Sequence, residues 1–154
     1  MALIGRFFVI VFAIVLATLA TGIAIVIIAV GPLQWHAFSG DFTERADFWI
    51  AVFFATSFTG AAGFLPAVIL IVLAEAFKVR SLLAHLLVGA ALLVAGYYAS
   101  GFAGPSYEES IDYPPPAIPR GIEIAAAGGA VFGGAYWLIA GRNAGRWRER
   151  RPTA

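Results

Sequence analysis

The sequence predicts an all-α integral membrane protein, a bundle of four transmembrane helices that runs up-down-up-down with both termini in the cytoplasm. Hydrophobic residues make up 61% of the 154 residues and charged residues only 12%, which leaves too little polar surface for a soluble domain. The sequence contains four long apolar runs. Basic residues flank these runs on one predicted side of the membrane, and most acidic residues lie in the connections on the opposite side. The positive-inside rule assigns these two sides to the cytoplasm and the exterior.

The charges define the two predicted sides of the bilayer. The basic residues of the cytoplasmic side are Arg6, Lys78, Arg80, Arg142, Arg146, Arg148, Arg150 and Arg151. The acidic residues of the external side are Asp41, Glu44, Asp47, Glu108, Glu109 and Asp112. The formal net charge is only +1, so the separation of positive and negative residues between the two sides is more informative than the net charge. We expect one membrane domain over residues 1–154, in a bacterial inner membrane, with the lipid bilayer as a partner and no nucleic acid.

The first predicted span covers residues 7–30, and its length is enough to cross a bilayer core of about 30 Å. A cleaved signal peptide is the rival interpretation, because Arg6 supplies a positive start and the residues 18–20 resemble a small-x-small cleavage site. The apolar run continues well past that site, which favours a span. Gly31 and Pro32 end it and open an external loop over residues 31–45.

The second predicted span covers residues 46–77, within a helix that starts near Phe42. Asp41 at the expected N-cap, with Glu44 three places later, has the spacing of a variant capping box. Pro66 falls inside the helix and predicts a kink. Small and hydroxylated residues precede this proline and favour both hydrogen bonding to freed backbone groups and close helix contact: Thr56, Ser57, Thr59, Gly60 and Gly63.

The third and fourth predicted spans cover residues 82–103 and 121–141. A tight turn joins the second and third spans, and Ser81 is the predicted N-cap of the third. An external loop over residues 104–120 precedes the fourth span, and a basic cytoplasmic tail over residues 142–154 follows it.

Small residues predict where the helices pack. Gly129 and Gly133 form a GxxxG motif in the fourth span, and Gly96, Ser100 and Gly104 form a second small-residue ridge on the third span. The simplest arrangement is direct contact between these two spans. Self-association, or contact with a partner membrane subunit, is the alternative use of the same motif.

Three ionisable residues near or inside the spans are the candidate functional polar groups, because charge in hydrocarbon is costly. Glu75 lies about one helical turn before the Lys78 and Arg80 cations, and an ion pair with them is the simplest interpretation. His85 lies on the same side, where a Glu–His proton relay is the functional alternative to a structural histidine. Glu123 begins the fourth span, where the helix dipole favours a carboxylate.

The sequence predicts no cofactor and no metal. There is no cysteine, which excludes disulfides and thiolate metal sites. His36 and His85 belong to opposite sides of the bilayer, so they cannot be the two axial ligands of one haem. Asp41, Glu44 and Asp47 near His36 have a spacing compatible with a divalent cation, but the capping and helix-dipole roles that they already fill argue against a metal site.

No catalytic motif is present, so enzymatic activity is the least supported class of function. We expect an accessory or scaffold subunit of a larger membrane assembly, which needs packing ridges, a fixed orientation and an exposed loop. The loop residues predicted to dock a partner are Glu108, Glu109, Asp112 and Tyr113, in a proline-rich segment that is otherwise a solvated connector. A small homo-oligomeric transporter or channel, using the Pro66 kink with Glu75 and His85, is the alternative.

Overall fold

The computed structural model describes residues 2–31, 41–101 and 118–145, and within them it is all helical. The helices are α1 (Ala2–Val30), α3 (Phe42–Ala76), α4 (Leu82–Ala99) and α5 (Arg120–Ile139), followed by a short 3-10 helix, η2 (Gly141–Asn143). No strand occurs in these ranges. The prediction of an all-helical bundle is therefore confirmed at the level of fold class.

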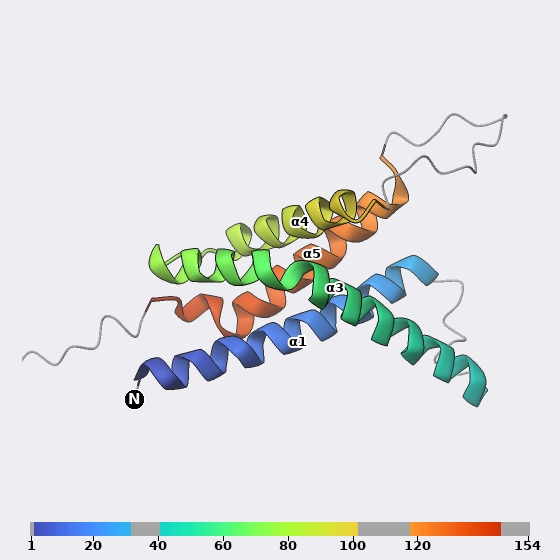
Figure 1. Cartoon of the computed structure of the whole chain (residues 1–154), viewed down its shortest axis with the longest axis horizontal. Helices are drawn as coiled ribbons and strands as arrows, with labels where there is room; N and C mark the ends of the chain where they lie inside the picture. The colour runs from blue at the N-terminus through green and yellow to red at the C-terminus, as the bar shows by residue number, and fades with distance from the viewer. Residues whose placement is uncertain (1, 32–40, 102–117, 146–154) are drawn as a thin grey trace, which may run out of the picture.

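Successive helices run in alternate directions, and α5 is the helix that joins the bundle (Figure 1). It lies against α4 along one side and against α1 along another, while α3 crosses α1. The start of α1, the α3–α4 turn and the end of α5 meet at one end of the bundle, which we call the inner end. The opposite end, where Arg120 reaches the last carbonyls of α1, is the outer end.

Helix α1 begins five residues before the predicted span. Its 29 residues correspond to a length of about 44 Å, more than the roughly 30 Å of a bilayer core. It ends where Gly31 adopts a positive φ of 77° and donates its N–H to the Ile27 carbonyl at 3.0 Å. Glycine adopts this left-handed conformation at little steric cost, which explains the position of the stop.

Helix α3 is bent by 57° between the segments Arg45–Ala61 and Gly63–Ala76. The break falls four residues before Pro66, where the proline ring clashes with the preceding turn and removes one backbone hydrogen bond. Asp41 occupies the N-cap position, but its side chain makes no capping hydrogen bond, which corrects the expected capping box.

The bend in α3 opens the outer half of the bundle. The half before the bend packs against α1, where Phe48 and Val52 are buried against Val26. The half after the bend lies beside α4 (Figure 1). Helix α3 therefore follows α1 at the outer end and leaves α4 uncovered there.

Helix α4 starts as expected, with the Ser81 hydroxyl accepting the N–H of Ala84 at 3.4 Å. It ends at Ala99, four residues before the predicted end at 103, because Gly101 takes a positive φ of 76°. Gly104 and Pro105, the expected stop, lie outside the described residues. Helix α5 covers Arg120–Ile139 and ends two residues before the predicted end, where η2 begins.

The backbones of α4 and α5 approach closely through glycines. A Cβ on Gly133 would collide with the carbonyl oxygen of His85, and a Cβ on Gly129 would collide with that of Gly89. The α5 positions are those of the GxxxG motif, but the partner on α4 is Gly89. A Cβ on Gly96 would meet nothing within 4 Å, so the ridge expected on the third span begins about two turns beyond the actual contact at Gly89.

A second close approach joins α1 and α3. A Cβ on Gly22 would collide with the Thr56 hydroxyl, which is buried and has no hydrogen-bond partner within the described part of the chain. Thr56 therefore lies at a close contact between α1 and α3, as expected. Its hydroxyl makes no hydrogen bond to the backbone groups freed by Pro66, contrary to the other expectation from the sequence. A buried cluster fills the inner half of the bundle: Ala13, Ala17, Ala67, Ile71, Phe132, Tyr136 and Ala140.

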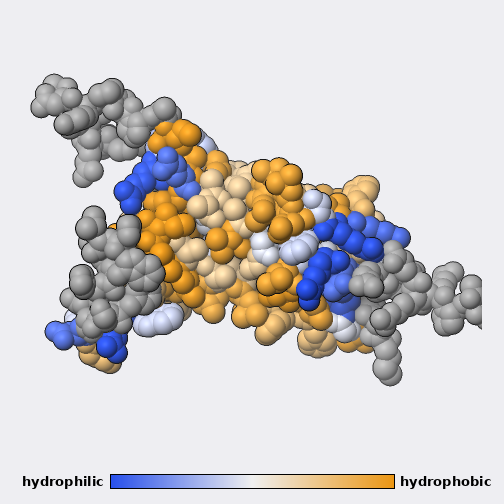
Figure 2. Space-filling view, turned by 180° about the vertical axis from the view of Figure 1, so that it is seen from behind, coloured by the Kyte–Doolittle hydropathy of each residue, from blue (hydrophilic) through white to orange (hydrophobic). Residues whose placement is uncertain are grey.

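Three helices are long and apolar enough to cross a membrane, and the bent α3 makes four if its two halves form one span. The surface is compatible with membrane insertion. On the face in Figure 2, hydrophobic side chains cover the middle of the bundle and hydrophilic side chains gather towards its two ends. An apolar belt between two polar ends is typical of helical membrane proteins.

Candidate functional site

The candidate site lies at the inner end, where charged groups from α1 and α3 meet the residues that follow α5. Arg6 of α1 and Glu75 of α3 form an ion pair, and the side chain of each is only 12% exposed. Arg6 Nε donates to Glu75 Oε1 at 3.0 Å, and Arg6 Nη2 donates to the Ala140 carbonyl at 2.8 Å. One arginine therefore connects three helical segments.

Glu75 has both carboxylate oxygens occupied. Arg6 binds Oε1, and the backbone N–H of Gly145 donates to Oε2 at 2.8 Å. This corrects the expected pairing with Lys78 and Arg80, because the partner is a residue 69 positions away in the sequence. A partly buried carboxylate with a cation and an N–H donor is well compensated.

His85 does not pair with Glu75 but packs between α4 and α5. Its Nδ1 lies 2.8 Å from the Ser81 carbonyl oxygen, and its ring stacks on Tyr136 with centroids 5.9 Å apart. Its Nε2 is buried and has no hydrogen-bond partner in the described ranges. A Cβ on Gly141 would come within 2.8 Å of this nitrogen, so the backbone of η2 covers it.

The segment after α5 folds back onto the α3–α4 turn. Arg80 Nε donates to the Ala144 carbonyl at 2.9 Å, and Trp137 Nε1 donates to the Arg80 carbonyl at 2.8 Å. Gly145 takes a positive φ of 73° beside the Lys78 side chain. No pattern in the sequence indicated these contacts, since they join residues more than 50 positions apart.

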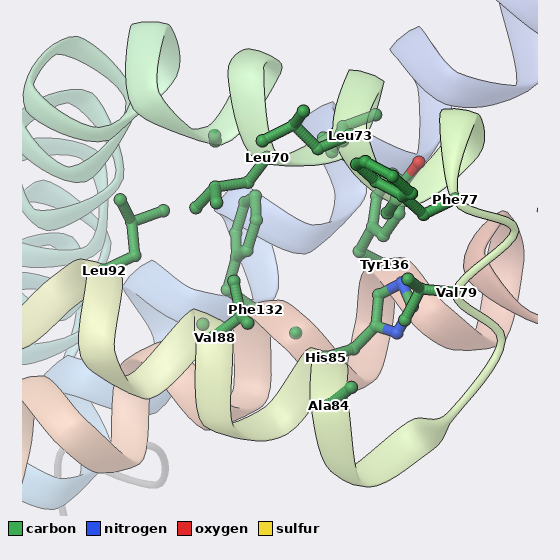
Figure 3. Close-up of a pocket in the computed structure, with 15 residues that line it drawn as sticks. Leu70, Leu73, Phe77, Val79, Ala84, His85, Val88, Leu92, Phe132 and Tyr136 are labelled. Atoms are coloured by element: carbon green, nitrogen blue, oxygen red, sulfur yellow. The ribbon is translucent and has the colours of Figure 1, made fainter.

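A half-open cavity of about 200 Å³, which we call the inner groove, lies between α3 and α4 beside this cluster. Figure 3 shows its walls: Leu70 and Leu73 from α3 face Val88 and Leu92 from α4. Phe77, the residue after α3, and Phe132 and Tyr136 of α5 complete the lining. His85 lies at the end nearest the turn. Almost all of its lining is apolar.

A larger cavity of about 550 Å³, the outer groove, lies where the bend takes α3 away from α4. Thr59, Gly63 and Pro66 of α3 and Gly96 of α4 are among the residues that line it. Neither Gly63 nor Gly96 has anything within 4 Å of its Cβ position. Two helix backbones are therefore accessible to an approaching molecule.

The other predicted residues are not gathered into either groove. Glu123 is exposed in the first turn of α5, as expected of a carboxylate near a helix N-terminus. Its neighbour Arg120 donates to the Ile28 and Ala29 carbonyls at 3.4 Å, a contact the sequence did not indicate. Ser100 is exposed and bonds within its own helix end, to the Tyr97 carbonyl at 2.9 Å.

Several predictions fall outside the described residues: His36, the docking residues Glu108, Glu109, Asp112 and Tyr113, and the tail beyond Gly145. Within the described ranges, no three His, Cys, Asp or Glu side chains are grouped so that they could hold a metal ion.

These features define the class of the protein as a helical bundle with several long apolar helices, one charged cluster that ties its inner end, and two half-open apolar grooves. No protein-family model, curated protein or solved structure matches the chain.

Proposed function

We propose that this chain is an accessory or scaffold subunit of a membrane assembly and that a transmembrane helix of a partner protein docks in the outer groove. In this proposal all four long helices cross the inner membrane of a bacterium, with the inner end in the cytoplasm. Cations at that end, including Lys78, Arg80 and Arg142, support the orientation.

The observation that carries the proposal is the outer groove itself. Helices in a bilayer associate through close backbone contact, because lipid tails are as apolar as leucine. Gly63 and Gly96 offer such contact on facing helices, and the groove volume of about 550 Å³ is held open by the proline bend. A partner helix would bury both glycines, whereas the bundle leaves them uncovered.

The inner-end cluster supports a non-catalytic role. Glu75 is engaged by Arg6 and Gly145, and His85 is stacked on Tyr136 beneath the η2 backbone. A proton pathway through these residues would first have to break the ion pair that joins α1 to α3. The transporter alternative therefore has less support than the scaffold.

The test compares two substitutions that each place a leucine on α4, one inside the outer groove and one outside it. Gly96→Leu places a large side chain in the outer groove, and nothing lies within 4 Å of its Cβ position. Ala91→Leu is the matched control, since Ala91 is exposed on the same helix and does not line the groove. Each tagged chain is purified gently from native membranes, and the stoichiometry of co-purifying membrane proteins is measured.

We expect one partner in constant stoichiometry with the wild type and with Ala91→Leu, and loss of that partner with Gly96→Leu. Recovery of the wild-type chain alone, as a monodisperse homo-oligomer unaffected by Gly96→Leu, would contradict the proposal and favour the transporter.

A further inference from the structure

We propose that the inner groove binds an acyl chain of an anionic phospholipid, with the headgroup held by the cations of the α3–α4 turn. The proposal rests on the membrane insertion put forward above, but it does not depend on any partner subunit.

The apolar half of the site is the groove between α3 and α4 (Figure 3). Leu73 and Val88 line it on opposite walls, and Phe132 forms its floor. Its volume of about 200 Å³ is below the 300–1,000 Å³ that is usual for sites enclosing a whole small molecule. The groove therefore suits part of a flexible chain that enters from the bilayer.

The charged half of the site is the turn at the end of the groove. Phe77 and Val79 line the groove, and Lys78 lies between them with Arg80 directly after. Both cations are exposed, so an anionic group can reach them. Arg80 is positioned by its bond to the Ala144 carbonyl, and Lys78 has its aliphatic stem against Gly145. Basic residues near the membrane surface attract anionic headgroups.

Charge and shape together favour a lipid over a partner helix at this site. The outer groove presents two glycine backbones, whereas the inner groove is walled by large side chains such as Leu70, Leu73 and Phe77. A helix could not bring its backbone close to these walls, but a single hydrocarbon chain can lie between them. The apolar groove ends at a pair of cations, which matches the order of chain and headgroup in an anionic phospholipid.

The experiment is native mass spectrometry of the chain purified alone and released from nanodiscs that contain equal amounts of phosphatidylglycerol and phosphatidylcholine. We expect wild type to retain one phosphatidylglycerol. Val88→Trp fills the groove and should lower this retention about tenfold, because the acyl chain loses its close van der Waals packing against the groove walls. Leu87→Trp is the matched control, since Leu87 is exposed on the same helix and does not line the groove.

The headgroup is tested separately. Lys78→Gln together with Arg80→Gln should remove the preference for phosphatidylglycerol, while Arg142→Gln, an exposed cation of η2, should keep it. Circular dichroism checks that each variant is folded, and Leu73→Trp on the facing helix replaces Val88→Trp if the latter is not.

Equal retention by wild type and both groove variants would overturn the proposal, as would equal retention of the two lipids by wild type. Retention of added palmitate in place of a phospholipid would show a fatty-acid site and would also overturn it. Because the partner is absent, none of these results depends on the outer groove.

Discussion

At the scale of the residue, the Arg6–Glu75 pair is the feature on which the inner end depends. These two side chains, each 12% exposed, connect α1 to α3, and their remaining hydrogen bonds reach the residues that follow α5. Removing one partner of a partly buried pair leaves the other charge uncompensated, which costs more than the pair itself contributes.

Glu75→Gln should lower the free energy of unfolding by about 1–3 kcal/mol, because it leaves Arg6 without its counter-charge. Thermal unfolding in detergent, followed by circular dichroism, measures the change. Glu123→Gln is the control, since Glu123 is exposed and forms no part of the cluster. If both variants melt at the same temperature, the ion pair is not the anchor described here.

The sequence predicted that Glu75 and His85 are candidate functional polar residues, but it did not predict which residues they contact. Local spacing pointed from Glu75 to Lys78 and Arg80, whereas its actual partner, Arg6, lies on another helix. Such pairing depends on how the helices pack, and the local spacing of charged residues does not determine which side chains of distant helices meet. The backbone partners Ala140 and Gly145 were unpredictable for the same reason.

At the scale of the element, glycines determine where the helices meet. The densest small-residue tract in the sequence lies on α5, and the structure places it against α4. Gly89 could not be preferred to Gly96 from the sequence, because the residues three and four positions from Gly89 on either side are His or Leu, so no ridge of small residues marks it. Pro66 predicted the bend in α3, but not the groove that the bend opens.

Gly133→Ala should destabilise the bundle by about 1–3 kcal/mol, because its Cβ would collide with the His85 carbonyl and separate α4 from α5. Gly96→Ala is the matched control on the facing helix. Its Cβ meets nothing, and alanine favours a helix over glycine by up to about 1 kcal/mol, so this variant should be neutral or slightly more stable. Unfolding in SDS, followed by tryptophan fluorescence, compares them; a larger loss for Gly96→Ala would refute the packing.

At the scale of the whole molecule, the fold class was the easiest property to predict. Long apolar runs separated by charged connections restrict the chain to helices, since a bilayer requires every backbone group to be bonded internally. The segregation of charge then predicted which ends lie together, and the inner end collects Arg6, the α3–α4 turn and η2. Function was not predictable in this way, because it depends on grooves that arise only from the bend and the crossings.

The central claim is that these helices cross a membrane with the inner end in the cytoplasm, and the absence of native cysteine makes the test direct. Phe77→Cys at the inner end and Phe42→Cys at the outer end each replace an exposed side chain, 76% and 88% accessible respectively. A membrane-impermeant maleimide is added to intact spheroplasts and, separately, to inverted vesicles. We predict that Phe42→Cys is labelled only in spheroplasts and Phe77→Cys only in inverted vesicles; labelling of both cysteines from the same face would contradict the account.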